Sequence, residues 1–302
     1  SLSKSILKTL LYFDIFKYPL TADEVFRHLQ TNHVTAHDVH EELIKMSTQS
    51  LVYPLDMFYS VHNDHLLESR RKQGNLMASK YLELAEKKAR VIASFPFVRG
   101  VMASGSLSKG YMDEKSDLDF FIVTKPGRLW IARTLLVMYK RLFLSGSHKL
   151  FCVNYFIDTE HLEIEEKNIF TATELATLIP LYGKSEYEQL IYRNSWVKDF
   201  LPNFLPQSCH AVSKANWYKK IAESILNLFG GSLLDRFCMS ITGKRWKKIY
   251  QAQYEKKDFE IAFKTKPYTS KNHPNHYQKK ITELYQEKLI TFEAQSGITW
   301  HE

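Results

Sequence analysis

The chain of 302 residues has little cysteine and no long apolar run. Its three cysteines, Cys152, Cys209 and Cys238, are widely spaced, so the sequence predicts reduced, buried thiols rather than a disulfide framework or a zinc site. No stretch reaches the about 18 consecutive apolar residues needed to cross a bilayer. No basic segment followed by an apolar one opens the chain. We therefore expect a cytoplasmic protein with no membrane partner.

Glycine is also scarce, with 11 residues in 302, which is about half the usual frequency. Three of these glycines, Gly100, Gly105 and Gly110, nevertheless fall in one short stretch, so a local feature of the backbone needs them. The hydrophobic content of 44% and charged content of 25% are those of a globular protein and exclude a disordered or fibrous chain. The length predicts two or three folding units.

Positive charge is concentrated in the C-terminal third. The net charge is +8, and residues 210–290 contain 16 Lys and Arg against 7 Asp and Glu. Such a surface suits phosphate-rich partners, so nucleotides and nucleic acid such as RNA are candidates for this region. A solvated helix surface has the same composition and is the alternative interpretation.

Residues 1–63 predict three helices followed by a short hairpin. The first helix covers residues 6–15 and ends before Pro19, and capping boxes begin the second and third helices at Thr21 and Thr35. Two short strands flank Leu55 and Asp56. This order resembles a winged helix. The third helix is rich in Glu and His rather than Arg, so scaffolding or dimerisation is favoured over DNA binding.

The rest of the chain predicts an α+β fold with a small mixed sheet and a helical C-terminal region. A long helix over residues 64–94 leads into a core ending at residue 165, with strands at 98–103, 118–124 and 150–158 and a helix at 129–144. Residues 166–302 predict helices at 172–179, 187–200 and 217–229. Residues 254–276, rich in Lys and Pro, are expected to be extended or mobile.

The residues that indicate chemistry lie between Val101 and Val123. A hydrophobic strand ends in Gly105 and Ser106 at the predicted start of a short helix, where backbone amides and a hydroxyl can hold phosphate oxygens. About ten residues later, Asp117 and Asp119 open an apolar strand, and the period of two places both carboxylates on one face, roughly 7 Å apart along the backbone. Two carboxylates beside a phosphate cradle suit Mg²⁺.

This pattern of strand, Gly-Ser turn and Asp-x-Asp resembles the nucleotidyltransferase superfamily related to DNA polymerase beta, over roughly residues 98–158. The resemblance implies transfer of a nucleoside monophosphate from a nucleoside triphosphate, with ATP the expected donor, to an acceptor hydroxyl. It implies that Asp117 and Asp119 bind Mg²⁺ or Mn²⁺, and that Gly105 and Ser106 hold the triphosphate. Lys109 adds charge in the same turn or faces solvent. The acceptor stays open between a small molecule, RNA and protein.

The superfamily usually carries a third carboxylate on the next strand, and here the sequence departs from the pattern. The strand over residues 150–158 has Asn154 at its centre and Asp158 at its end, on one face by the two-residue period. Asp158 is the predicted third catalytic carboxylate. Asn154 as a substituted position, or Glu160 or another acid, are the alternatives.

Two weaker features leave function open. Thr171 and Glu174 fit the start of a helix with a capping box, which explains both residues without catalysis. His273 and His276 are closely spaced but lack further ligands at zinc spacing. The alternatives to a transferase are a degenerate core that binds a nucleotide or a partner without turnover, and a DNA-binding regulator that works through the winged-helix-like segment.

Overall fold

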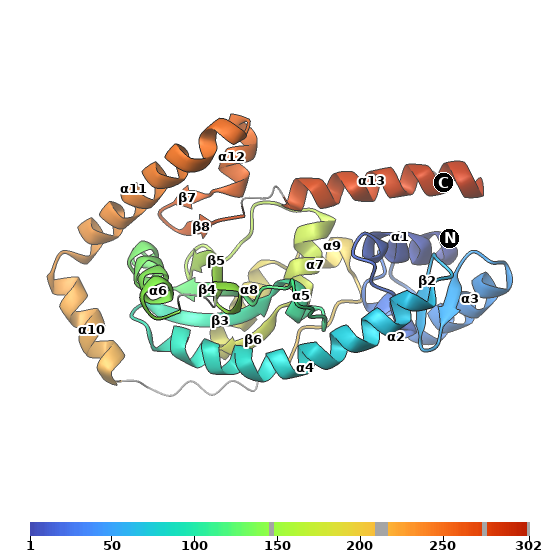
Figure 1. The fold of residues 1–302 in the computed structure, drawn as a ribbon, viewed down its shortest axis with the longest axis horizontal. Helices are drawn as coiled ribbons and strands as arrows, with labels where there is room; N and C mark the ends of the chain where they lie inside the picture. The colour runs from blue at the N-terminus through green and yellow to red at the C-terminus, as the bar shows by residue number, and fades with distance from the viewer. Residues whose placement is uncertain (145–147, 209–216, 274–276, 301–302) are drawn as a thin grey trace.

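The computed structural model describes residues 1–144, 148–208, 217–273 and 277–300, and within them the chain has an α+β fold (Figure 1). The α-helices are α1 Leu2–Asp14, α2 Ala22–Arg27, α3 Ala36–Thr48, α4 His65–Ser94, α5 Gly105–Ser108, α6 Leu129–Phe143, α7 Ile169–Thr177, α8 Lys184–Arg193, α9 Val197–Phe200, α10 Trp217–Leu228, α11 Gly231–Tyr250, α12 Lys256–Ala262 and α13 Tyr277–Ser296. The strands are β1 Tyr53–Leu55, β2 Phe58–Ser60, β3 Val98–Ser104, β4 Asp119–Thr124, β5 Cys152–Asp158, β6 Ile179–Tyr182, β7 Thr265–Lys266 and β8 Thr269–Lys271.

The N-terminal module contains its three helices and hairpin in the predicted order. Both predicted capping boxes are present, formed by Thr21 with Glu24 and by Thr35 with Asp38. The core of the module is completed from the other end of the chain, because α13 packs against α1 and buries apolar residues there (Figure 1). The module therefore depends on a helix that lies more than 200 residues away in the sequence.

The module is fastened to α4 and to the turn after β3. Arg71 of α4 is buried, donates to the carbonyl oxygen of Pro19 at 2.5 Å and pairs with Glu24 at 2.6 Å. Its guanidinium lies 3.8 Å from the ring centroid of Tyr18, and the Tyr18 hydroxyl donates to the carbonyl oxygen of Lys109. The N-terminal module thus contacts the Gly-rich segment directly.

A six-stranded sheet in the order β6-β3-β4-β5-β8-β7 forms the centre of the molecule. Strands β4 and β5 are parallel and the other neighbours are antiparallel. Residues of α4, α6 and α12 pack in the core on one face, and residues of α7, α8 and α9 pack on the other. Three of the six strands come from residues 166–302, so the sheet extends across the boundary predicted at residue 165.

Two helices predicted in the C-terminal region have other bounds in the structure. The helix predicted over 172–179 ends at Thr177, and the following residues form β6, because Pro180 disfavours a helical conformation at Ile179. The helix predicted over 187–200 is two helices, α8 and α9, interrupted at Asn194. The buried Asn194 side chain accepts a hydrogen bond from the Ile164 amide and donates one to the Leu162 carbonyl oxygen, and these bonds fix the interruption.

The segment expected to be extended or mobile is ordered over most of its length. It contains α12 and the β7–β8 hairpin, and β8 pairs with β5. The apolar side chains of Phe259, Ala262 and Phe263 are buried in the main core and hold the segment in place. Residues 274–276, including His276, lie outside the described residues.

Two further features bear on the sequence predictions. Across the described ranges, no helix combines the length and apolarity needed to cross a bilayer. Cys152 and Cys238 are free thiols as expected but only half-buried, and Cys209 lies outside the described residues.

Candidate functional site

A cavity of about 900 Å³ lies beside the sheet, between the β3–β4 region, α7 and the segment from α12 to α13. It brings together five of the six predicted site residues, namely Gly105, Ser106, Lys109, Asp117 and Asp119. Asp158, the sixth, does not line it. The predicted phosphate cradle and the predicted carboxylate pair therefore face the same space, although they come from different strands.

Gly105 is required at its position for two reasons. Its φ of +66° is in the left-handed region, where a side chain is strained. A Cβ there would also lie 2.5 Å from Oδ2 of Asp119. The glycine thus lets the turn that ends β3 approach the carboxylate directly. The helix that follows, α5, is only 4 residues long.

We expect Gly105→Ala to displace Asp119 and to weaken nucleotide binding by about tenfold or more, besides costing about 1–2 kcal/mol of stability through backbone strain. Gly127→Ala is the matched control, because Gly127 has a φ of +65° but nothing within 4 Å of its added Cβ. Thermal unfolding and triphosphate titration of both variants measure the two effects. Equal loss of binding in both would contradict the close approach of Gly105 to Asp119.

Asp119 lies in a crowded acidic environment at the start of β4. Its Oδ1 accepts a hydrogen bond from Nδ2 of Asn154 at 3.1 Å. Burial, followed by the negative charges of Asp117 and Glu174, raises the pKa of Asp119 to about 7, although Lys109 and Asn154 act in the opposite direction. The arrangement favours a bound cation at this carboxylate.

The other charged residues of the turn have partners. Nζ of Lys109 pairs with Oε1 of Glu174 at 2.6 Å and donates to the carbonyl oxygen of Gly105 at 3.1 Å. Lys109 therefore ties α7 to the turn, and Glu174 already balances its charge. Oδ2 of Asp117 lies 3.9 Å from Sγ of Cys152, the first residue of β5.

The structure places Asp158 outside the cavity and away from Asp119. In the β4–β5 register Asp119 is opposite Cys152 and Asp158 is opposite Thr124, so the two acids lie about 16 Å apart along the strands. The buried Asp158 carboxylate instead accepts from the backbone amides of Glu160 and His161 at 3.0 and 2.9 Å. Asp158 closes the turn after β5.

Asn154 occupies the place beside Asp119 where a third carboxylate was sought. The register of β4 and β5 shifts at this point, from Phe120 opposite Val153 to Phe121 opposite Tyr155. The shift breaks the two-residue period that placed Asn154 and Asp158 on one face. An amide supplies no negative charge here, so the site differs from the superfamily pattern at this position.

Glu174 is the site residue that the sequence analysis explained otherwise. The N-cap of α7 is Asn168, whose Oδ1 accepts from the Thr171 amide at 3.0 Å, so the capping box predicted for Thr171 and Glu174 is wrong. Glu174 is free of a capping role and faces Lys109 in the cavity. The Asn at residue 168, three residues before Thr171, was the available signal for the true helix start.

The C-terminal region supplies the opposite wall of the cavity, which includes Lys271 and Gln278. Lys271 is buried, and burial lowers its pKa. Its Nζ donates to Oε1 of Gln278 at 3.1 Å and lies 5.8 Å from the ring centroid of Tyr155. Within the described ranges no carboxylate lies within ion-pair distance of Lys271, whereas the neighbouring Lys264 pairs with Glu166 at 2.6 Å.

The donor set at Asp119 suits a metal held in part by a substrate. Across the described residues, no three His, Cys, Asp or Glu side chains gather as a complete metal-binding group. Two carboxylates lining one cavity fit Mg²⁺ or Mn²⁺, because Mg²⁺ commonly takes one or two protein carboxylates and completes its shell with phosphate and water.

Comparison of the chain with models of protein families, with curated proteins and with solved structures finds no match. Interpretation of the site therefore depends on its own residues and geometry.

Proposed function

We propose that the chain is a metal-dependent nucleotidyltransferase that moves a nucleoside monophosphate from a nucleoside triphosphate, with ATP the expected donor, to an acceptor hydroxyl. The observation that carries the proposal is the single cavity shared by the Gly105–Ser106 turn and the Asp117 and Asp119 carboxylates. The close approach of Gly105 to Asp119 supports it, because it joins the two halves of the motif at one point.

The residues of the cavity have separate roles in binding the phosphates, binding the cation and accepting the proton. The turn at Gly105 and Ser106 holds the phosphate tail through backbone amides and the serine hydroxyl. Asp117 and Asp119 hold the divalent cation, which when bound offsets negative charge on the phosphates. The acceptor oxygen forms a bond to the α-phosphorus as the bond to the bridging oxygen breaks and pyrophosphate leaves. Asn154 cannot take the acceptor proton, so Glu174, whose charge acts on Asp119, is the candidate for that role.

Lys271 extends the proposal to the far wall of the cavity. A buried lysine without a carboxylate partner is costly, and an anionic ligand offsets that cost. Strand pairing sets three side chains in a row across the sheet, because Phe121 is opposite Tyr155 and Tyr155 is opposite Lys271. The row begins two residues from Asp119, on the same face of β4. We assign Lys271 to the phosphates of the donor or to an anionic group of the acceptor.

Replacing Lys271 with methionine keeps its length and removes its charge. We expect Lys271→Met to weaken triphosphate binding about tenfold to a hundredfold, because a hydrogen bond to a charged group contributes about 1.5–3 kcal/mol. The variant should also be at least as stable as the wild type, since a buried charge is removed. Lys184→Met, at an exposed lysine of α8, is the control. Unchanged affinity of Lys271→Met for every triphosphate, with an unchanged KM for the acceptor, would contradict the assignment.

Asn154 favours a second candidate function, in which the core binds a nucleotide or a partner without turning it over. An amide in place of the third carboxylate weakens metal binding and removes a base. This alternative predicts metal-dependent binding of a triphosphate without release of pyrophosphate.

For the N-terminal module we propose a supporting role rather than duplex recognition. Its order of elements is that of a winged helix, but the exposed side of α3 presents His37, Asp38, His40 and Glu41, and this surface does not suit phosphate contacts. Tyr18 and Arg71 instead fasten the module to the turn at Lys109.

Transfer of label from α-labelled triphosphates tests the proposal. The full chain is incubated with each of the four triphosphates, Mg²⁺ or Mn²⁺, and separate pools of small hydroxylated molecules, RNA and protein. Label incorporation with pyrophosphate release supports the transferase and identifies the acceptor class. Binding without incorporation in any pool supports the second candidate.

A further inference from the structure

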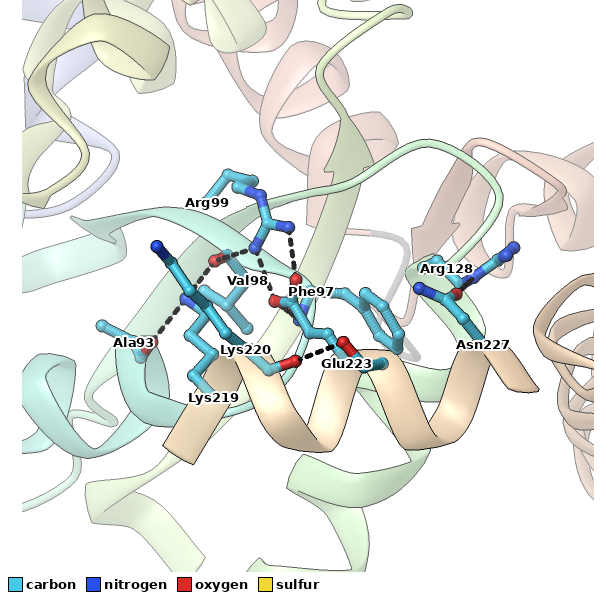
Figure 2. Close-up of polar contacts among 10 residues, drawn as sticks. Ala93, Phe97, Val98, Arg99, Arg128, Lys219, Lys220, Glu223 and Asn227 are labelled. Carbon is cyan, nitrogen blue, oxygen red and sulfur yellow. Dashed lines mark hydrogen bonds and ion pairs between the residues drawn. The ribbon is translucent and has the colours of Figure 1, made fainter. Parts of the chain in front are cut away.

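Helix α10 is attached to the protein by its polar side (Figure 2). Lys219, Glu223 and Asn227 follow one another at intervals of four residues and point toward the body of the molecule. Burial lowers the pKa of Lys219 to about 8. Nζ of Lys219 donates to the carbonyl oxygens of Ala93 and Val98 at 2.8 and 2.5 Å. The Glu223 carboxylate accepts from the Phe97 amide at 2.7 Å and from Arg99 at 2.8 Å. The side-chain oxygen of Asn227 accepts from Nε of Arg128 at 2.7 Å.

Most of the apolar residues on the other side of the same helix, and several in the first half of α11, are exposed. Leu228 is 85% exposed, Phe229 80% and Leu233 74%. None of the residues of α10 is fully buried. We call this surface the α10–α11 face; its exposed apolar residues are Trp217, Tyr218, Ile221, Ile225, Leu228, Phe229, Leu233, Phe237 and Ile241. A concentration of exposed apolar side chains of this kind marks a surface that another body covers.

The charges around the α10–α11 face have one sign. Every acidic side chain between residues 217 and 250 is turned inward, since Glu223 binds Arg99 and the buried Asp235 accepts from the Ile131 amide at 3.0 Å. The basic residues other than Lys219 are exposed; they are Lys220, Arg236, Lys244, Arg245, Lys247 and Lys248. The outward surface therefore combines apolar and aromatic side chains with positive charge alone.

We propose that the α10–α11 face binds an anionic lipid surface, with the helices lying on the membrane rather than crossing it. Helices with Trp, Phe and Leu on one side and Lys and Arg beside them bind at the boundary between headgroups and acyl chains. A second copy of the chain would oppose the same positive charges across a two-fold axis, which disfavours self-association through this face. RNA would use the lysines but leave the apolar residues uncovered. The proposal is independent of the transferase chemistry.

Vesicle flotation with the full chain tests this inference. Vesicles of phosphatidylcholine alone are compared with vesicles containing about one third phosphatidylglycerol. We expect binding to the anionic vesicles, with weakening at high salt, and little binding to the neutral ones. Leu228→Glu with Phe229→Glu should lower the bound fraction by about tenfold or more. Lys244→Glu with Lys248→Glu should also lower it by about tenfold or more.

Matched controls use exposed positions on α4. Leu66 is 76% exposed, and Lys80 and Lys87 are also exposed, so Leu66→Glu and the pair Lys80→Glu with Lys87→Glu should leave flotation unchanged. Circular dichroism confirms that each variant is folded. Three outcomes would overturn the proposal: no flotation of the wild type, equal flotation of variants and controls, or a wild-type dimer that becomes monomeric in the Leu228→Glu, Phe229→Glu variant without any vesicle binding.

Discussion

Asp119→Asn is expected to reduce the proposed metal-dependent transfer by at least about 10³-fold, because it removes one of the two carboxylates that we propose to hold the cation. The substitution retains the shape of the side chain and can still accept the hydrogen bond that Asn154 donates at 3.1 Å. The loss should therefore come from charge rather than from misfolding. Release of pyrophosphate and transfer of α-label measure the effect.

The same variant should be more stable than the wild type when divalent cations are removed with a chelator. Burial, followed by the negative charges of Asp117 and Glu174, raises the pKa of Asp119 to about 7, so its charge opposes folding at neutral pH. We expect the free energy of unfolding to rise by about 1–2 kcal/mol, after allowance for solvent at this half-buried group.

Asp158→Asn is the control for both measurements, since Asp158 lies outside the cavity and closes a turn. It should lower stability and leave transfer unchanged. Loss of transfer in Asp158→Asn to the degree seen in Asp119→Asn would contradict the site as described.

The second large effect concerns acid stability and His28 in the N-terminal module. Burial lowers the pKa of His28 to about 4, and its Nδ1 is buried without a hydrogen-bond partner in the described part of the chain. Between pH 6.5 and about 4 the unfolded chain takes up a proton that the folded chain does not. The contribution of the neutral His28 to the free energy of unfolding is thus fully present above pH 6.5. It falls by about 2 kcal/mol as the pH falls toward 4.

His28→Leu should remove this part of the pH dependence, because the leucine packs on Phe13, whose ring centroid lies 4.7 Å from that of His28. Urea unfolding at neutral pH and near pH 4.5 measures the slope. His40→Leu, at an exposed position of α3, should retain the wild-type slope. If wild type and His28→Leu lose the same free energy of unfolding between neutral pH and pH 4.5, groups other than His28 cause the acid sensitivity.

The sequence predicted those parts of the fold that short, local signals specify. Capping boxes at Thr21 and Thr35 mark their helices because each box satisfies two backbone amides within four residues. The Gly-Ser turn and the Asp pair are likewise local, so their residues could be placed before their shared cavity was known.

The parts that failed depend on long-range contacts. The short strand β8 has no apolar run of its own and forms because it pairs with β5 more than 100 residues earlier. The register shift at Asn154 is a property of two strands together, so a period counted along one strand misplaced Asp158. Glu174 could not be assigned to the site from sequence, because its partner Lys109 is 65 residues away.

The central claim is that Asp119 and the Gly105–Ser106 turn form one nucleotide site. Calorimetric titration of the four nucleoside triphosphates into wild type and Asp119→Asn, each with and without Mg²⁺, tests it most directly because no acceptor is needed. The account predicts that at least one triphosphate binds the wild type only with Mg²⁺ and that the variant loses this binding. Failure of every triphosphate to bind the wild type in the presence of Mg²⁺ would contradict it.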